Sequence, residues 1–118
     1  MPHRLEITLK PELIDAEGET LRRKALDYFG IVVERVRTVA VITIDTDLTP
    51  SQLETVRTEI FTNPVTQTSS YAPLPLTFDW VIWIGYRPGV RDNAGSTAVE
   101  AVEDMLGIKM GPEEGIYT

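Results

Sequence analysis

Residues 7–31 read ITLKPELIDAEGETLRRKALDYFGI, and residues 84–108 read IGYRPGVRDNAGSTAVEAVEDMLGI. The second stretch lies 77 positions after the first. Without a gap the two are identical at eight of 25 positions: Ile7/Ile84, Pro11/Pro88, Asp15/Asp92, Gly18/Gly95, Thr20/Thr97, Asp27/Asp104, Gly30/Gly107 and Ile31/Ile108. Many of the shared residues set backbone geometry, because proline ends a strand, aspartate caps a turn and glycine ends a helix. The sequence therefore predicts a duplicated strand–turn–helix.

The first copy begins a longer βαβαβ pattern. Residues 4–10 alternate polar and apolar side chains, as a half-buried strand does. A helix with apolar residues at helical spacing follows and ends at Gly30, a C′ glycine. The β-branched run from Arg35 to Asp45 predicts a strand in the centre of a sheet.

The second half of that pattern starts with a clear helix signal. Thr49-Pro50-Ser51-Gln52 has the form of a capping box with proline at N1, and Asn63-Pro64 ends the helix. Residues 65–71 then predict an edge strand. The fold class we expect is α+β, an antiparallel sheet with the helices on one face.

We expect one compact domain with two unequal parts. Residues 1–72 form the βαβαβ unit, the proline-rich residues 73–77 form a connector, and residues 78–118 form a partial second repeat. A duplication of this kind reproduces within one chain what two subunits related by a two-fold axis would do, so the arrangement is expected to be pseudo-dimeric. The incomplete second copy suggests a fragment of a longer polypeptide.

Composition limits the possible functions. The chain has 118 residues, no cysteine, a single histidine and a formal net charge of −7. These features argue against thiol or histidine catalysis and against a zinc site. The negative charge disfavours nucleic acid and anionic membranes, and no apolar run is long enough to cross a bilayer. We therefore expect a cytoplasmic protein with no catalytic or metal-binding residues of its own.

Two segments of the second copy are candidate sites. Arg87, Arg91 and Asn93 lie in a turn before a predicted helix, where two arginines favour an anion. The alternative is structural: Asp15 and Asp92 cap equivalent turns, and the first copy has glutamates in place of the arginines.

The other segment is the predicted strand at residues 78–86, which is apolar on both faces. Val81 and Trp83 stand there where the first copy has Arg4 and Glu6. Such a strand is expected to be buried on both faces, either in the core or against a partner, so Val81 and Trp83 are candidate interface residues.

The sequence resembles the PurS component of phosphoribosylformylglycinamidine (FGAM) synthase. The resemblance covers roughly residues 4–71, and the second half is similar to the N-terminal region of large synthase polypeptides that have a fused PurS-like part. The resembling residues of the first half are Leu9-Lys10-Pro11, Asp15-Ala16-Glu17-Gly18, the strand from Val36 to Ile44, and Asn63-Pro64-Val65.

The resemblance implies an assembly role in purine biosynthesis. PurS subunits dimerise and help bring the synthase and glutaminase together, and a fused duplicate would supply that dimer in cis. The parent enzyme is then an ATP- and magnesium-dependent ligase, with ammonia from glutamine displacing an ATP-activated amide oxygen. The implied partners are the synthase core and the glutaminase, with a homodimer as a further possibility and no cofactor in this chain.

Two other classes stay open. An ACT-type regulatory domain has a similar order of strands and helices and binds ligands near the turn after its first strand, here Pro11 to Gly18. An enzyme on a ferredoxin-like fold, such as an acylphosphatase, needs an arginine and an asparagine around a phosphate loop, which Arg87 to Asn93 only loosely imitates.

Overall fold

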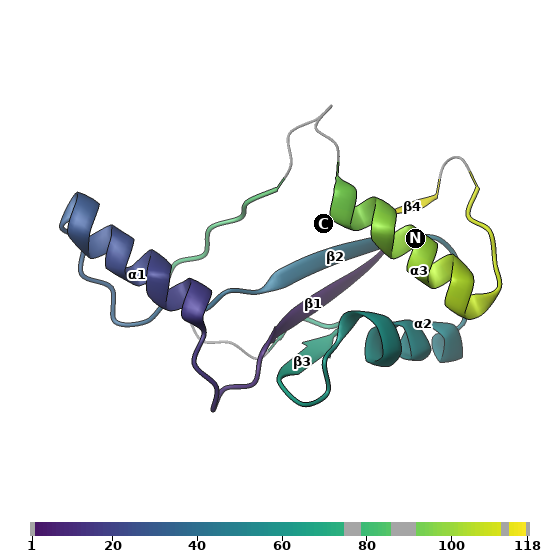
Figure 1. The fold of residues 1–118 in the computed structure, drawn as a ribbon, viewed down its shortest axis with the longest axis horizontal. Helices are drawn as coiled ribbons and strands as arrows, with labels where there is room; N and C mark the ends of the chain where they lie inside the picture. The colour runs from purple at the N-terminus through teal and green to yellow at the C-terminus, as the bar shows by residue number, and fades with distance from the viewer. Residues whose placement is uncertain (1, 75–78, 86–91, 112–113, 118) are drawn as a thin grey trace.

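The computed structural model describes residues 2–74, 79–85, 92–111 and 114–117. Its sheet contains β1 (His3–Leu9), β2 (Ala40–Asp45), β3 (Gln67–Ser70) and β4 (Gly115–Tyr117), in the order β3-β1-β2-β4 with every neighbouring pair antiparallel (Figure 1). The helices are α1 (Ala16–Phe29), α2 (Pro50–Val56), its continuation η1 (Arg57–Phe61), and α3 (Asn93–Leu106). The α+β fold class is confirmed. The strand predicted at residues 35–45 is central but shorter, beginning at Ala40, and the one predicted at residues 65–71 is the edge strand β3.

The alternation in the first strand separates two faces of the sheet. Leu5 and Ile7 are buried on the helix-covered face, and Leu5 lies opposite Ile42 of β2. Arg4 and Glu6 point to the other face, where they form an ion pair at 3.5 Å. Because side chains alternate along a strand, this pattern fixes which face receives the helices.

The capping box at the start of α2 forms as predicted. The Thr49 hydroxyl oxygen accepts a hydrogen bond from the Gln52 N–H at 3.1 Å, and the Gln52 side chain accepts one from the Thr49 N–H at 2.9 Å. The predicted continuous α-helix is wrong in its second half, because η1 is a π-helical turn. This wider turn brings Ile60 and Phe61, adjacent in sequence, both against the core.

The core joins one buried residue from each of four elements. Ile44 of β2, Val56 of α2, Val102 of α3 and Ile116 of β4 pack together and are almost inaccessible to solvent. No residue of α1 belongs to this cluster, and Figure 1 shows α1 beyond one end of the sheet, away from α2 and α3. The helix that covers the sheet beside α2 is therefore α3 of the second repeat, not α1 of the first.

Residues 79–85 do not form the predicted strand. The described part of the predicted segment 78–86 has no partner in the sheet, and Trp80, Ile82 and Ile84 are exposed. A strand is stabilised by the hydrogen bonds of a partner strand, and no described strand pairs with this segment. Residue 78, residue 86 and most of the predicted connector lie outside the described residues.

The hydroxyl of Tyr71, next to edge strand β3, should titrate at an unusually high pH. This hydroxyl donates a hydrogen bond to the Leu53 carbonyl at 2.7 Å, and burial raises the pKa of Tyr71 to about 12. Because this folded-state pKa exceeds the ordinary value of 10.0, the contribution of Tyr71 to stability is complete below pH 10 and is lost toward pH 12. We expect the absorbance titration at 295 nm to contain a transition near pH 12 that Tyr71→Phe removes. If Tyr71→Phe leaves the titration curve unchanged, the buried hydroxyl is refuted.

Candidate functional site

The site residues predicted from the second copy are only partly brought together. Trp83 stacks on Arg4 of β1, with the guanidinium carbon 4.1 Å from the ring centroid, a cation–π contact. Val81 and Trp83 remain 59% and 64% exposed, so in this chain the predicted burial of this segment is not seen. Arg87 and Arg91 lie outside the described residues. Asn93 is the first residue of α3, and its carbonyl accepts a hydrogen bond from the Thr97 hydroxyl.

Two exposed apolar surfaces stand out among the described residues. The first, called here the α1 face, consists of Leu21, Ala25 and Phe29, and Leu21 and Phe29 are 44% and 76% exposed. The second is the run of five apolar side chains from Trp80 to Ile84, all exposed. Single exposed apolar residues are common, but contiguous groups mark surfaces that pack against another layer.

The turn between β1 and α1 is held by Asp15. Its carboxylate accepts hydrogen bonds from the Gly18 N–H at 2.9 Å and from the N–H and hydroxyl of Thr38 at 2.6 and 2.7 Å. Burial alone would raise the pKa of Asp15, but these hydrogen bonds and the charge of Arg37 bring its pKa below the ordinary value. Asp15 therefore ties the start of α1 to the chain leading into β2.

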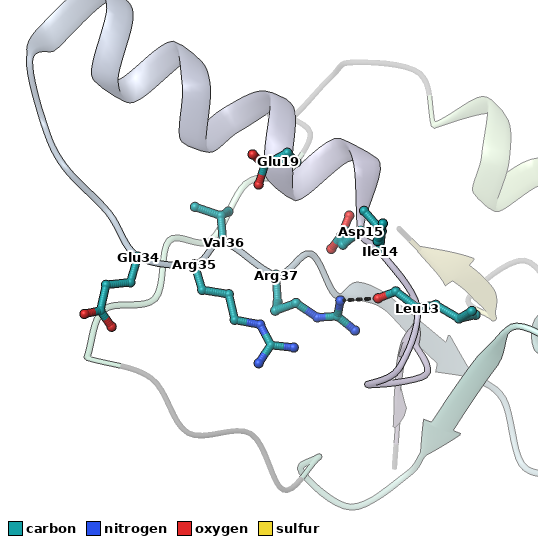
Figure 2. A pocket seen from close by; sticks show the side chains of 8 residues that line it. All are labelled: Leu13, Ile14, Asp15, Glu19, Glu34, Arg35, Val36 and Arg37. Atoms are coloured by element: carbon teal, nitrogen blue, oxygen red, sulfur yellow. Dashed lines mark hydrogen bonds between the residues drawn. The ribbon is translucent and has the colours of Figure 1, made fainter.

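Arg37 completes the same connection from the other side. Its guanidinium donates to the Leu13 carbonyl at 3.0 Å (Figure 2). It also donates to the carbonyls of Leu9 at 3.0 Å and Lys10 at 3.3 Å. Arg37 was expected to lie within a strand from residue 35 onward, so its hydrogen bonds to this turn were not predicted. An arginine in a polar–apolar strand pattern carries no signal for three distant carbonyls.

A shallow pocket of about 190 Å³ opens beside this turn. It is lined by Leu13, Ile14, Asp15, Glu19, Glu34, Arg35, Val36 and Arg37 (Figure 2). It lies where the ligand turn of an ACT-type domain was expected. The polar groups of Asp15 and Arg37, however, already form hydrogen bonds within the turn itself. The ACT-type alternative stays a prediction.

The corresponding turn of the second repeat has the same capping geometry. Asp92 accepts from the Gly95 N–H at 2.8 Å, as Asp15 does from Gly18, which confirms the predicted capping role of both aspartates. Gly30 and Gly107 end the two helices with φ of 65° and 66°, in the left-handed region that favours glycine.

Two searches of the described residues bear on cofactors and membranes. Within residues 2–74, 79–85, 92–111 and 114–117, no three His, Cys, Asp or Glu side chains are grouped to hold a metal ion. In the same part of the chain, no helix has the length and apolar character that crossing a membrane requires.

Comparison with known proteins gives a consistent result. Residues 3–73 match the PurS family, described as phosphoribosylformylglycinamidine (FGAM) synthase. The solved structure of Methanocaldococcus jannaschii PurS, one of the subunits of formylglycinamide ribonucleotide amidotransferase in the purine biosynthetic pathway, matches with 26% identity and a TM-score of 0.51. That match covers 58% of this chain and 89% of the other.

A second solved structure, Thermus thermophilus PurS, matches with 25% identity and a TM-score of 0.46 over 63% of this chain and 96% of the other. No curated protein matches the sequence.

The order β1-α1-β2-α2-β3 and the antiparallel sheet define a small α+β protein built on one βαβαβ unit. The family match covers the whole of that unit. The chain belongs to the PurS family and is a PurS-like region of FGAM synthase, an enzyme of purine biosynthesis.

Proposed function

We propose that this chain is a non-catalytic assembly domain of FGAM synthase that brings the synthase core and the glutaminase together in de novo purine biosynthesis. The observation that carries the proposal is the PurS match over residues 3–73, since the PurS protein of M. jannaschii is a subunit of the amidotransferase. The exposed apolar surfaces support it, because an assembly domain needs surfaces that become buried in a complex.

In this proposal ATP and magnesium belong to the synthase core. Among the described residues, no three His, Cys, Asp or Glu side chains lie close enough together to hold a metal ion. The sequence also has no glycine-rich phosphate loop followed by lysine. In this proposal the chain holds the other components in place and takes no part in the chemical steps.

The test is a reconstitution from three components. The chain is mixed with the matching synthase core and glutaminase in the presence of glutamine and nucleotide, and the mixture is analysed by size-exclusion chromatography with light scattering. We expect co-elution and glutamine-dependent activity that is restored only when the chain is present.

Variants locate the contact within that experiment. Trp83→Ala removes one of the two tryptophans of the second exposed surface and is expected to weaken the affinity for the complex by about tenfold or more. Glu59→Ala, an exposed change on η1, is the matched control and should leave co-elution unchanged. Absence of association together with unchanged activity would reject the assembly role.

A further inference from the structure

The pocket beside the first turn lies between two segments that are distant in the sequence. One is the turn before α1, with Leu13, Ile14 and Asp15, and the other is residues 34–37, which lead toward β2. The volume of about 190 Å³ is below the roughly 300 Å³ at which sites for drug-sized ligands begin. The pocket therefore suits a compact ligand rather than a nucleotide.

Most of the charged groups on the pocket wall already have partners within the protein. Asp15 and Arg37 are held by the hydrogen bonds described above, and the Glu19 carboxylate accepts hydrogen bonds from the Arg22 guanidinium at 3.0 Å. Arg35 differs from them, because among the described residues it forms no hydrogen bond or ion pair. Its N–H donors are therefore available to a ligand.

Arg35 and Arg37 both direct a guanidinium group to the pocket. Figure 2 shows the two groups on the same side of the chain that leads toward β2, with the Glu34 side chain directed away from them. Arg37 is fixed in position because three carbonyl groups accept its Nη–H hydrogen bonds. Two neighbouring guanidinium groups favour an anion, and the planar fork of each matches the two oxygens of a carboxylate.

The acidic side chains around the pocket select against an anion of higher charge. Asp15, Glu19 and Glu34 also belong to the lining. A phosphate dianion would be repelled by them about twice as strongly as a carboxylate, which has a single charge. The charge balance of the pocket therefore favours a monoanion.

The rest of the lining is aliphatic. Leu13, Ile14 and Val36 form this part of the wall, and Ile14 is 84% exposed. An alkyl group on the ligand would remove part of the Ile14 side chain from water, which is favourable in proportion to the apolar area covered. The pocket thus combines an anion-binding part and an apolar part.

We propose that this pocket binds a small aliphatic monocarboxylate, with the carboxylate between Arg35 and Arg37 and the alkyl group against Ile14 and Val36. The bound ligand connects the turn before α1 to the chain that enters β2. This inference goes beyond the assembly role. Its test requires neither the synthase core nor the glutaminase, so the two proposals can fail separately.

The probe is sodium butyrate, titrated into the ¹⁵N-labelled chain at constant ionic strength and followed by two-dimensional NMR. We expect saturable shifts of the Nε–H signals of Arg35 and Arg37, with a Kd on the order of 1–10 mM, which is within reach of a ligand with six non-hydrogen atoms. The melting temperature should rise by about 4 °C or more in about 50 mM butyrate relative to the same concentration of sodium chloride.

Variants separate the two parts of the site. Arg35→Gln removes the available guanidinium and should weaken butyrate binding by about tenfold or more. Lys24→Gln, an equal loss of charge at an exposed position of α1, is the matched control and should leave binding unchanged. Ile14→Ala should weaken butyrate binding about threefold but leave acetate binding unchanged, because acetate lacks the longer alkyl chain. Arg35 and Ile14 are both exposed, so these variants should fold.

Three results would overturn the proposal. The first is the absence of a saturable shift up to about 100 mM butyrate. The second is a shift that Arg35→Gln preserves, since the response would then come from another part of the chain. The third is tighter binding of inorganic phosphate than of butyrate, which would make the pocket a phosphate site.

Discussion

Replacing Gly18 with alanine is expected to lower the free energy of unfolding by about 1–3 kcal/mol, the usual cost of forcing extra atoms into a packed site. The added Cβ would lie 2.2 Å from the Val36 carbonyl oxygen, a contact with backbone that cannot rotate away. Alanine is the better helix former by about 1 kcal/mol, so an exposed helical glycine would show the opposite sign. Chemical denaturation decides between the two.

The other glycines supply the controls for this experiment. Gly95→Ala should destabilise the chain to a similar extent, since its Cβ would lie 2.4 Å from the Ile116 carbonyl oxygen. Gly85→Ala adds a Cβ with nothing within 4 Å and should change stability by less than about 0.5 kcal/mol. A stabilising Gly18→Ala would mean that α1 does not begin against Val36.

Asp15→Ala is expected to cost about 2–4 kcal/mol of stability at neutral pH. The change removes a helix N-cap, worth about 1 kcal/mol, together with two charge-assisted hydrogen bonds to Thr38. It also leaves the Thr38 N–H without this partner and leaves Arg37 without the nearby charge. The free energy of unfolding from urea titration at pH 7 measures the loss.

The pH dependence of the same variant tests the cause. The folded-state pKa of Asp15 is lowered from 3.8, so its contribution is present above that pH and is lost as the pH falls through the folded-state pKa. The difference between the parent chain and Asp15→Ala should therefore shrink below about pH 4. Asp27→Ala, an exposed carboxylate on α1, is the control and should stay within about 0.5 kcal/mol at every pH. A difference that does not vary with pH would contradict the role of the charged carboxylate.

Local signals made much of the fold predictable. The alternation around Leu5 and Ile7, the β-branched run of β2 and the capping box at Thr49 each depend on neighbouring residues. Each of these elements forms, although β2 begins at Ala40 rather than at Arg35. The capping roles of Asp15 and Asp92 were predictable for the same reason.

The position of α1 was not predictable. An amphipathic pattern shows that a helix has an apolar face to bury, but it does not show which sheet that face packs against. The apolar spacing of Leu21 and Phe29 is the same whether the helix covers its own unit or another. For residues 79–85 the strand propensity was clear, but a strand needs a hydrogen-bonding partner, and none of the described strands pairs with this segment. The structural role of Arg37 was not predictable, because the three carbonyls to which it donates are 24 or more residues away in the sequence.

The place of β4 in the sheet also sets the order in which the sheet can be completed during synthesis. β1 meets β2 within about 40 residues, but Ile44 meets Ile116 only 72 residues further along the chain. At a ribosomal rate of 5–20 residues per second, roughly 4–14 s separate the two halves of this contact. During that interval one edge of β2 in the nascent chain has unpaired backbone N–H and C=O groups. Such an edge can pair with a strand of a neighbouring chain and lead to misassembly. Because contacts between distant residues form slowly, we expect the closure of this long loop to limit the folding rate, and a chaperone that shields β2 to raise the yield of native protein.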